Sequence, residues 1–154
     1  MQTFFTDYLN LLQERHNEIL EALYGLPSAA LDRTPGPDMN SISVLVFHLT
    51  GSTRYWIGDI AAQESSNRDR EAEFRVHDID VDILKQRLAD NLEYARNTLN
   101  EFTTEDLQTT RSSAGSDRTF TVGWALLHAL EHASLHLGQI QLTRQLWEGT
   151  KEKA

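Results

Sequence analysis

Three histidines, His128, His132 and His136, follow one another at intervals of four residues in the segment LLHALEHASLHLGQI. In an α-helix this interval advances about 40° around the axis and about 6 Å along it, so two neighbouring histidines can bind one ion. His128 and His136 would be about 12 Å apart along the axis, whereas a metal–nitrogen bond is about 2.0–2.1 Å. One helix therefore offers at most two of these ligands to one metal ion.

His48 is the best-placed third ligand, because it lies in SVLVFHLTG on the apolar stripe of a second expected helix. An imidazole in an apolar environment needs a metal or a hydrogen-bond partner. Two helices that face each other would thus bring His48, His132 and His136 to one ion. The pattern alone also allows each of them to be a hydrogen-bonded core residue.

The other histidines and the remaining polar chemistry fit fewer kinds of site. The sequence has no cysteine, which excludes disulfides, cysteine-ligated zinc, iron–sulfur clusters and a cysteine nucleophile. The Glu-x-x-His pairs of di-iron bundles and the His-Glu-x-x-His motif of zinc proteases are both absent. Ser134 lacks the surroundings of a nucleophile elbow. We expect His16 and His77 to be surface or boundary residues and His128 to have a structural role.

The charge pattern argues against nucleic acid and membrane partners. The 154 residues include 14 Lys and Arg against 23 Asp and Glu, a formal net charge of −9 that would repel phosphate backbones and anionic lipid surfaces. The first residues, MQTFFTDYLN, do not have the pattern of a secretory signal, and no run of about 18 apolar residues occurs. We therefore expect a cytoplasmic protein.

Apolar residues recur at helical spacing in four segments, which predicts an all-α protein with one four-helix-bundle domain over residues 1–154. We expect Gly25 and Pro27 to end the first helix and Gly149 to end the fourth. Connections of more than ten residues can cross the end of the bundle, so the order of the helices stays open. The expected helices cover residues 2–24, 41–63, 80–99 and 121–146.

The polar connection over residues 64–78 is long enough for a functional flap or a mobile loop, and Phe74 could pin it to the body. Arg68, Arg70 and Arg75 could gate the site and attract an anionic cosubstrate, or they could form a solvated run of charge. No carboxylate is identified as a general base, because Glu131 would lie about 100° around the helix from His132.

LVFHLTGSTRYW, which contains His48, and HASLHLGQIQLTRQL resemble the DinB-like superfamily of proposed metal-dependent enzymes. This superfamily includes bacillithiol transferases and mycothiol-dependent maleylpyruvate isomerases, and the resemblance covers nearly the whole chain. It implies a four-helix bundle, a homodimer, and a divalent metal ion held by His48, His132 and His136. Gln139 follows the last of them and is expected either to hydrogen-bond a ligand or to pack beside Gly138, and Tyr55 is expected near the pocket.

Three imidazoles leave open positions on a divalent ion, which suits catalysis better than a closed structural site. With no cysteine in the chain, a reacting thiol would be a low-molecular-weight cosubstrate. We therefore expect a thiol-dependent S-transferase or isomerase that acts on a small molecule. Two alternatives stay open, a hydrolase that uses metal-bound hydroxide and a noncatalytic, metal-binding or stress-associated dimer. Imidazole ligands suit zinc, nickel or iron, and the sequence assigns no catalytic residue and no organic cofactor.

Overall fold

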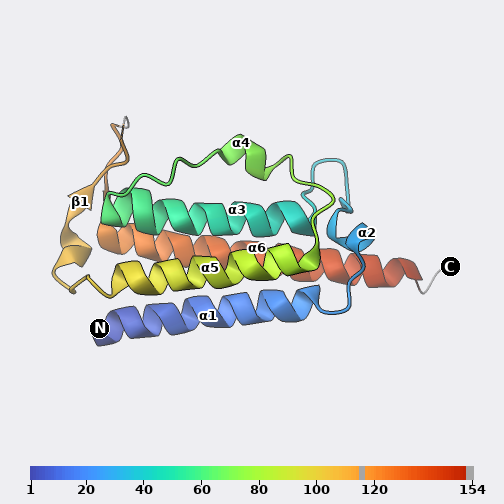
Figure 1. The fold of residues 1–154 in the computed structure, drawn as a ribbon, viewed down its shortest axis with the longest axis horizontal. Coiled ribbons are helices and arrows are strands. Elements are labelled where there is room, and N and C mark those ends of the chain that lie inside the picture. The colour runs from blue at the N-terminus through green and yellow to red at the C-terminus, as the bar shows by residue number, and fades with distance from the viewer. Residues whose placement is uncertain (115–116, 152–154) are drawn as a thin grey trace.

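The computed structural model describes residues 1–114 and 117–151. Its body is a bundle of four long helices (Figure 1). In the second of them an α-helix passes directly into a π-helix, η1. The predicted all-α bundle is therefore confirmed. The long helices are α1 (Thr3–Leu23), α3 (Ile42–Arg54) with η1 (Tyr55–Ala62), α5 (Val81–Leu99) and α6 (Val122–Lys151).

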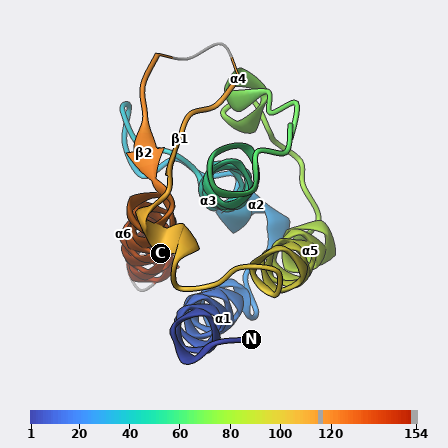
Figure 2. The same cartoon turned by 90° about the vertical axis from the view of Figure 1, so that its left-hand side faces the viewer.

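The helices are arranged so that α1 lies diagonally opposite α3, and α5 lies diagonally opposite α6 (Figure 2). Figure 1 shows that α1 and α6 run in one direction, whereas α3 and α5 both run in the other. Two connections thus cross the ends of the bundle, and the connection between the parallel helices α3 and α5 must travel back along the bundle. The short helix α4 (Arg70–Glu73) lies in that returning segment, over α3.

The ends of the long helices are fixed by local chemistry. The Ser41 hydroxyl accepts a hydrogen bond from the Val44 amide at the start of α3, at 3.3 Å, and the Asp80 carboxylate caps α5 in the same way. After α1, Gly25 adopts a φ of 73°, which favours glycine. The Arg144 guanidinium of α6 donates to the carbonyl oxygens of Glu21, Ala22 and Tyr24, so it binds the C-terminal end of α1.

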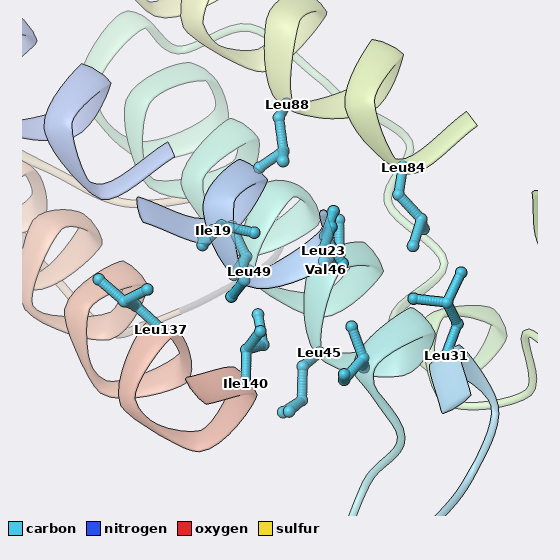
Figure 3. Packing of buried hydrophobic residues seen from close by; sticks show 12 residues of the cluster. Ile19, Leu23, Leu31, Leu45, Val46, Leu49, Leu84, Leu88, Leu137 and Ile140 are labelled. Carbon is cyan, nitrogen blue, oxygen red and sulfur yellow. The ribbon is translucent and has the colours of Figure 1, made fainter. Parts of the chain in front are cut away.

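All four helices contribute to the apolar core. Figure 3 shows Leu137 and Ile140 of α6 near Leu45 and Leu49 of α3, with leucines of α5 and residues of α1 around them. A second buried cluster lies around Phe5, Leu12, Ile57, Leu99 and Leu126. These side chains are fully buried or nearly so, and each contributes about 1.5–3 kcal/mol relative to an exposed position.

Some features differ from the sequence-based expectations. The prediction that Gly149 ends the last helix is wrong, because α6 continues to Lys151. One exposed helical glycine costs only about 1 kcal/mol and need not end a helix. A short 3₁₀ helix, η2 (Asp106–Gln108), lies between α5 and α6. The antiparallel pair β1 (Thr110–Arg111) and β2 (Phe120–Thr121) was not expected, and its strands are too short to show an alternating pattern.

A short helix, α2 (Ser28–Leu31), follows the first long helix. Its buried residues, Ala30 and Leu31, lie beside α3. Within the described residues, no helix has the length and apolar character needed to cross a bilayer.

Candidate metal centre

His48 of α3 and His132 and His136 of α6 form one cluster in the fold. One nitrogen atom from each ring lies within 4.8 Å of the other two. The ring centroid of His48 lies 4.9 Å from that of His132 and 5.0 Å from that of His136. His48 and His136 are buried, whereas His132 is half-buried. The expectation that two facing helices bring these three side chains together is confirmed.

The orientation of the His48 ring is set by Glu73 of α4. His48 Nδ1 lies 2.9 Å from Glu73 Oε2, and the Glu73 side chain is buried. Arg68 donates two hydrogen bonds to the same carboxylate, from Nε to Oε1 at 2.6 Å and from Nη2 to Oε2 at 2.8 Å. Such paired, charge-assisted bonds fix the position of the carboxylate.

The carboxyl group of Glu73 is ionised in this environment. Burial raises its pKa, but the hydrogen bonds and positive charges of Arg68 and His48 together lower it more, so that the pKa lies below its ordinary value. An ionised carboxylate can only accept hydrogen bonds, and His48 Nδ1 must therefore carry the hydrogen. The lone pair of His48 is then on Nε2, which leaves that nitrogen as the one able to bind a metal.

The close approach of Glu73 to α3 depends on Gly51, three residues after His48. A Cβ atom at position 51 would overlap the Oε1 atom of Glu73 and contact Arg68. Any other residue at this position would push the carboxylate away from His48.

The rings of His132 and His136 are held in a second arrangement on α6. His136 Nδ1 lies 2.7 Å from Gln139 Oε1 and donates to it, which leaves Nε2 of His136 with its lone pair. His132 Nε2 lies 3.1 Å from His136 Nε2. Two nitrogens bound to one ion at about 2.0–2.1 Å in neighbouring positions are about 2.8–3.4 Å apart, so this spacing fits a shared ion. Of the two expectations for Gln139, the hydrogen bond to a candidate ligand is confirmed.

The electrostatics of the cluster favour neutral imidazoles. Burial, and after it the nearby His136, His48, His128 and Arg68, lower the pKa of His132 to about 3. The pKa of His136 is also lowered, chiefly by burial, although the Gln139 hydrogen bond opposes this. Neutral imidazole is the form that binds a metal, so no proton has to be removed from His132 near neutral pH.

These observations fit a divalent cation. Three imidazoles converge, two of them have Nδ1 hydrogens fixed by Glu73 and Gln139, and Nδ1 of His132 is buried without a hydrogen-bond partner. A carboxylate or amide behind a histidine is the usual outer support of a metal ligand. The donor set suits zinc, nickel or iron.

His128, the third member of the repeat, does not belong to this cluster. Its ring stacks on Trp124 with centroids 4.8 Å apart and an interplanar angle of 15°, and it meets Trp56 edge-on. Its Nδ1 lies 3.5 Å from a carboxylate oxygen of the exposed Glu131. His128 thus packs against the two tryptophans, which contact each other, and the structural role expected for it stays a prediction.

The expectation for His16 is wrong. This side chain of α1 is 2% exposed, and burial lowers its pKa to about 4. It lies on the inner stripe of α1 between Leu12 and Ile19, where a polar residue at an apolar position is buried by its neighbours. His77 is exposed, as predicted.

The connection over residues 64–78 contributes more to the cluster than its sequence suggested. Arg68 is not part of a solvated run of charge, whereas Arg70 and Arg75 are exposed. The Phe74 ring lies 4.7 Å from that of His48, so it does pin the segment to the body. Glu73 was missed entirely. Tyr55 contacts the same connection, because the Arg68 guanidinium lies over its ring. Its hydroxyl donates a hydrogen bond to Ser113 Oγ, which lies outside that connection.

Comparisons with known proteins agree with this fold. The chain has a TM-score of 0.79 with a conserved protein from Enterococcus faecalis, at 18% identity, covering 97% of this chain and 99% of that one. YfiT from Bacillus subtilis, described as a probable metal-dependent hydrolase with an unusual four-helix bundle topology, gives 0.71 at 14% identity, covering 94% and 89%. A DinB-like protein from Bacillus cereus gives 0.65 at 15% identity, covering 90% and 89%.

No curated protein matches the sequence. The model of the DinB superfamily matches residues 11–140, a range that contains all three clustered histidines. The chain therefore belongs to the DinB superfamily.

Proposed function

We propose that the protein is a metal-dependent enzyme in which His48, His132 and His136 bind one divalent ion. The observation that carries this proposal is that one nitrogen of each ring lies within 4.8 Å of the other two. The Nδ1 atoms of His48 and His136 are fixed by Glu73 and Gln139. Three protein ligands leave at least one position for a further ligand, as in catalytic rather than structural sites.

An ion in this site would lower the pKa of a thiol or water bound to it and so supply a nucleophile near neutral pH. The protein residues have supporting roles. Glu73 orients His48, Gln139 orients His136, and Arg68 keeps Glu73 ionised and in place. Phe74 covers the His48 ring. A substrate would reach the cluster beside His132, which is half-buried whereas the other two histidines are buried.

The reaction that we propose is an S-transfer or isomerisation that depends on a low-molecular-weight thiol. The chain has no cysteine, so the thiol must come from a cosubstrate. Support for a thiol comes from the resemblance of the two histidine segments to those of bacillithiol transferases and mycothiol-dependent isomerases. A second candidate, metal-dependent hydrolysis, is favoured by the description of YfiT, which has the same fold.

Metal binding is the first test. Protein purified without a histidine tag should contain about one equivalent of zinc, nickel or iron by elemental analysis. His132→Ala should lose that metal. His77→Ala should retain it, because His77 is exposed and does not belong to the cluster. Equal metal content in the wild type and His132→Ala would contradict the proposed ligands.

Activity is the second test. Metal-loaded protein is incubated with a panel of small thiols and model electrophiles, and product is measured with and without each thiol. Turnover that needs both thiol and metal, and that His132→Ala loses, supports the transferase. Turnover without thiol supports the hydrolase. Equal rates in loaded and chelated protein across both panels would favour a noncatalytic bundle.

A further inference from the structure

A cavity of about 530 Å³ lies between α3, α5 and the connection that carries α4. Glu73, which bonds His48, lines this cavity, while none of the three clustered histidines lines it. The cavity therefore adjoins the residues that support His48 but does not contain the three clustered histidines. Its size is in the range of sites for small molecules.

Arg87 of α5 brings a positive charge to this cavity. Its guanidinium lies 3.9 Å over the Phe47 ring, and its Nη2 donates to Thr50 Oγ1 at 3.2 Å. Among the described residues, no carboxylate lies within ion-pair distance of Arg87, and its Nε is buried without a hydrogen-bond partner. Glu73 and Asp90 attract the Arg87 guanidinium from beyond ion-pair distance. No carboxylate is bonded to this partly buried guanidinium, so its planar fork can still bind an anionic ligand directly.

Arg54 of α3 brings a second charge to the same cavity. Its guanidinium lies 3.8 Å over the Tyr94 ring, and its Nη1 is buried without a partner. Its one carboxylate neighbour within the described part of the chain is Glu64, at 3.5 Å and half-exposed. Both guanidinium groups are thus held in place by an aromatic ring, which lowers the entropy that a bound ligand would cost.

The acidic residues around the cavity already have partners. Glu73 accepts from Arg68 and His48, Asp69 caps the first turn of α4, and Asp90 accepts from Gln86. By contrast, Arg87 Nε and Arg54 Nη1 are buried donors without a hydrogen-bond partner.

We propose that Arg54 and Arg87 form a binding site for the oxyanion of a small molecule, a carboxylate or a phosphate. The planar guanidinium fork matches both kinds of anion. Phe47, Val76 and Ala72 give the cavity an apolar part, which would accept the uncharged portion of the ligand. This site does not depend on the proposed enzymatic function.

The test is calorimetric titration of the full chain with inorganic phosphate and with benzoate, at pH 7.5 and constant sodium chloride. Arg87→Met keeps an unbranched chain to pack on Phe47 and should weaken binding at least about tenfold, as should Arg54→Met. Arg87→Lys keeps the charge without the fork and should fall between Arg87→Met and the wild type. Arg75→Gln is the control, because Arg75 is exposed on the same connection and does not line the cavity.

A phosphate ion can also bind a metal, so His132→Ala is titrated in parallel. Binding that persists in His132→Ala and Arg75→Gln but falls in the variants of Arg54 and Arg87 supports the site. Binding that is lost in His132→Ala would place the anion on the metal and overturn the proposal. No heat from either probe, or equal affinity in Arg54→Met and the wild type, would also overturn it. Circular dichroism checks that each variant folds, and Arg54→Met and Arg87→Lys keep the test decisive where Arg87→Met does not.

Discussion

Replacing Glu73 with glutamine is expected to weaken metal binding by about 10- to 100-fold, the usual effect of removing an outer partner of a metal-binding histidine. Glutamine has nearly the same shape, but its amide has no charge. His48 Nδ1, now 2.9 Å from a carboxylate oxygen, would meet a neutral acceptor or the amide NH₂ group. Its ring would be held less firmly and would be a weaker base.

The same substitution should lower the free energy of unfolding by about 3 kcal/mol. Breaking a buried ion pair by removing one partner costs about 3–5 kcal/mol, because the remaining charge stays buried. The side chains of Glu73 and Arg68 are 7% and 15% exposed, so solvent screens this pair little. We expect the lower end of the range, since the amide oxygen of glutamine still accepts one of the hydrogen bonds from Arg68.

The matched control is Glu71→Gln, which makes the same chemical change two residues earlier in α4. The Glu71 side chain is 86% exposed, and its nearest cation, Arg75, is 3.5 Å away and exposed too. Surface pairs of this kind contribute at most about 1 kcal/mol. Metal affinity is measured by competition with a chromophoric chelator, and stability by urea unfolding.

Acid should also distinguish the two variants. The pKa of Glu73 is lower in the folded chain than in the unfolded one, so its stabilising effect is present above the unfolded value of 4.5 and is lost as the pH falls through the folded pKa. Glu73→Gln cannot titrate at this position, so its free energy of unfolding should fall less than that of the wild type as the pH is lowered. Wild-type metal affinity in Glu73→Gln, or an equal loss in Glu71→Gln, would refute the role assigned to Glu73.

Three further outcomes are expected. Gly51→Ala should lower both stability and metal affinity, because its Cβ would displace the Glu73 carboxylate. Urea unfolding measures the first and chelator competition the second, and a loss of only one of them would contradict the prediction. Between pH 6.5 and about 4 the unfolded chain binds a proton at His16 that the folded chain does not. The free energy of unfolding of the wild type should therefore fall by up to about 3 kcal/mol across this window. His16→Leu should not show this fall when urea unfolding is measured at each pH. We also propose a homodimer with the exposed Leu135 and Leu142 of α6 at its interface. In sedimentation the wild type should be a dimer and Leu135→Glu a monomer. A variant with the same mass as the wild type would show that this face of α6 is not the interface.

The sequence was sufficient for features that depend on local periodicity. Residues spaced at three and four recur on the stripes of α1, α3, α5 and α6, and burial of those stripes requires the helices to pack. His48 could be selected because it is a polar residue on such a stripe, and His132 and His136 because they lie four residues apart. The same reasoning failed for His16, which also lies on an inner stripe but was expected at a boundary.

Glu73 could not be selected, because its position depends on how the chain returns between α3 and α5. Asp69 is a recognisable helix cap, and its side chain does accept from the Ala72 amide. A single turn of four residues has too little periodicity to show which of Glu71 and Glu73 faces the body. The π-helix η1 is likewise hidden, since its sequence also fits an ordinary helix.

The support of His48 by Glu73 follows from the topology of the bundle. α3 and α5 run in the same direction, so the chain that leaves η1 must return along the bundle before α5 begins. The 13 residues of α3 alone span about 20 Å, and a tight turn cannot cover such a distance. The returning segment lies over α3, on the helix that carries His48, and Gly51 lets its α4 turn approach closely. A bundle of simple hairpins would have left this side of His48 to solvent, whereas this order of helices places a carboxylate there.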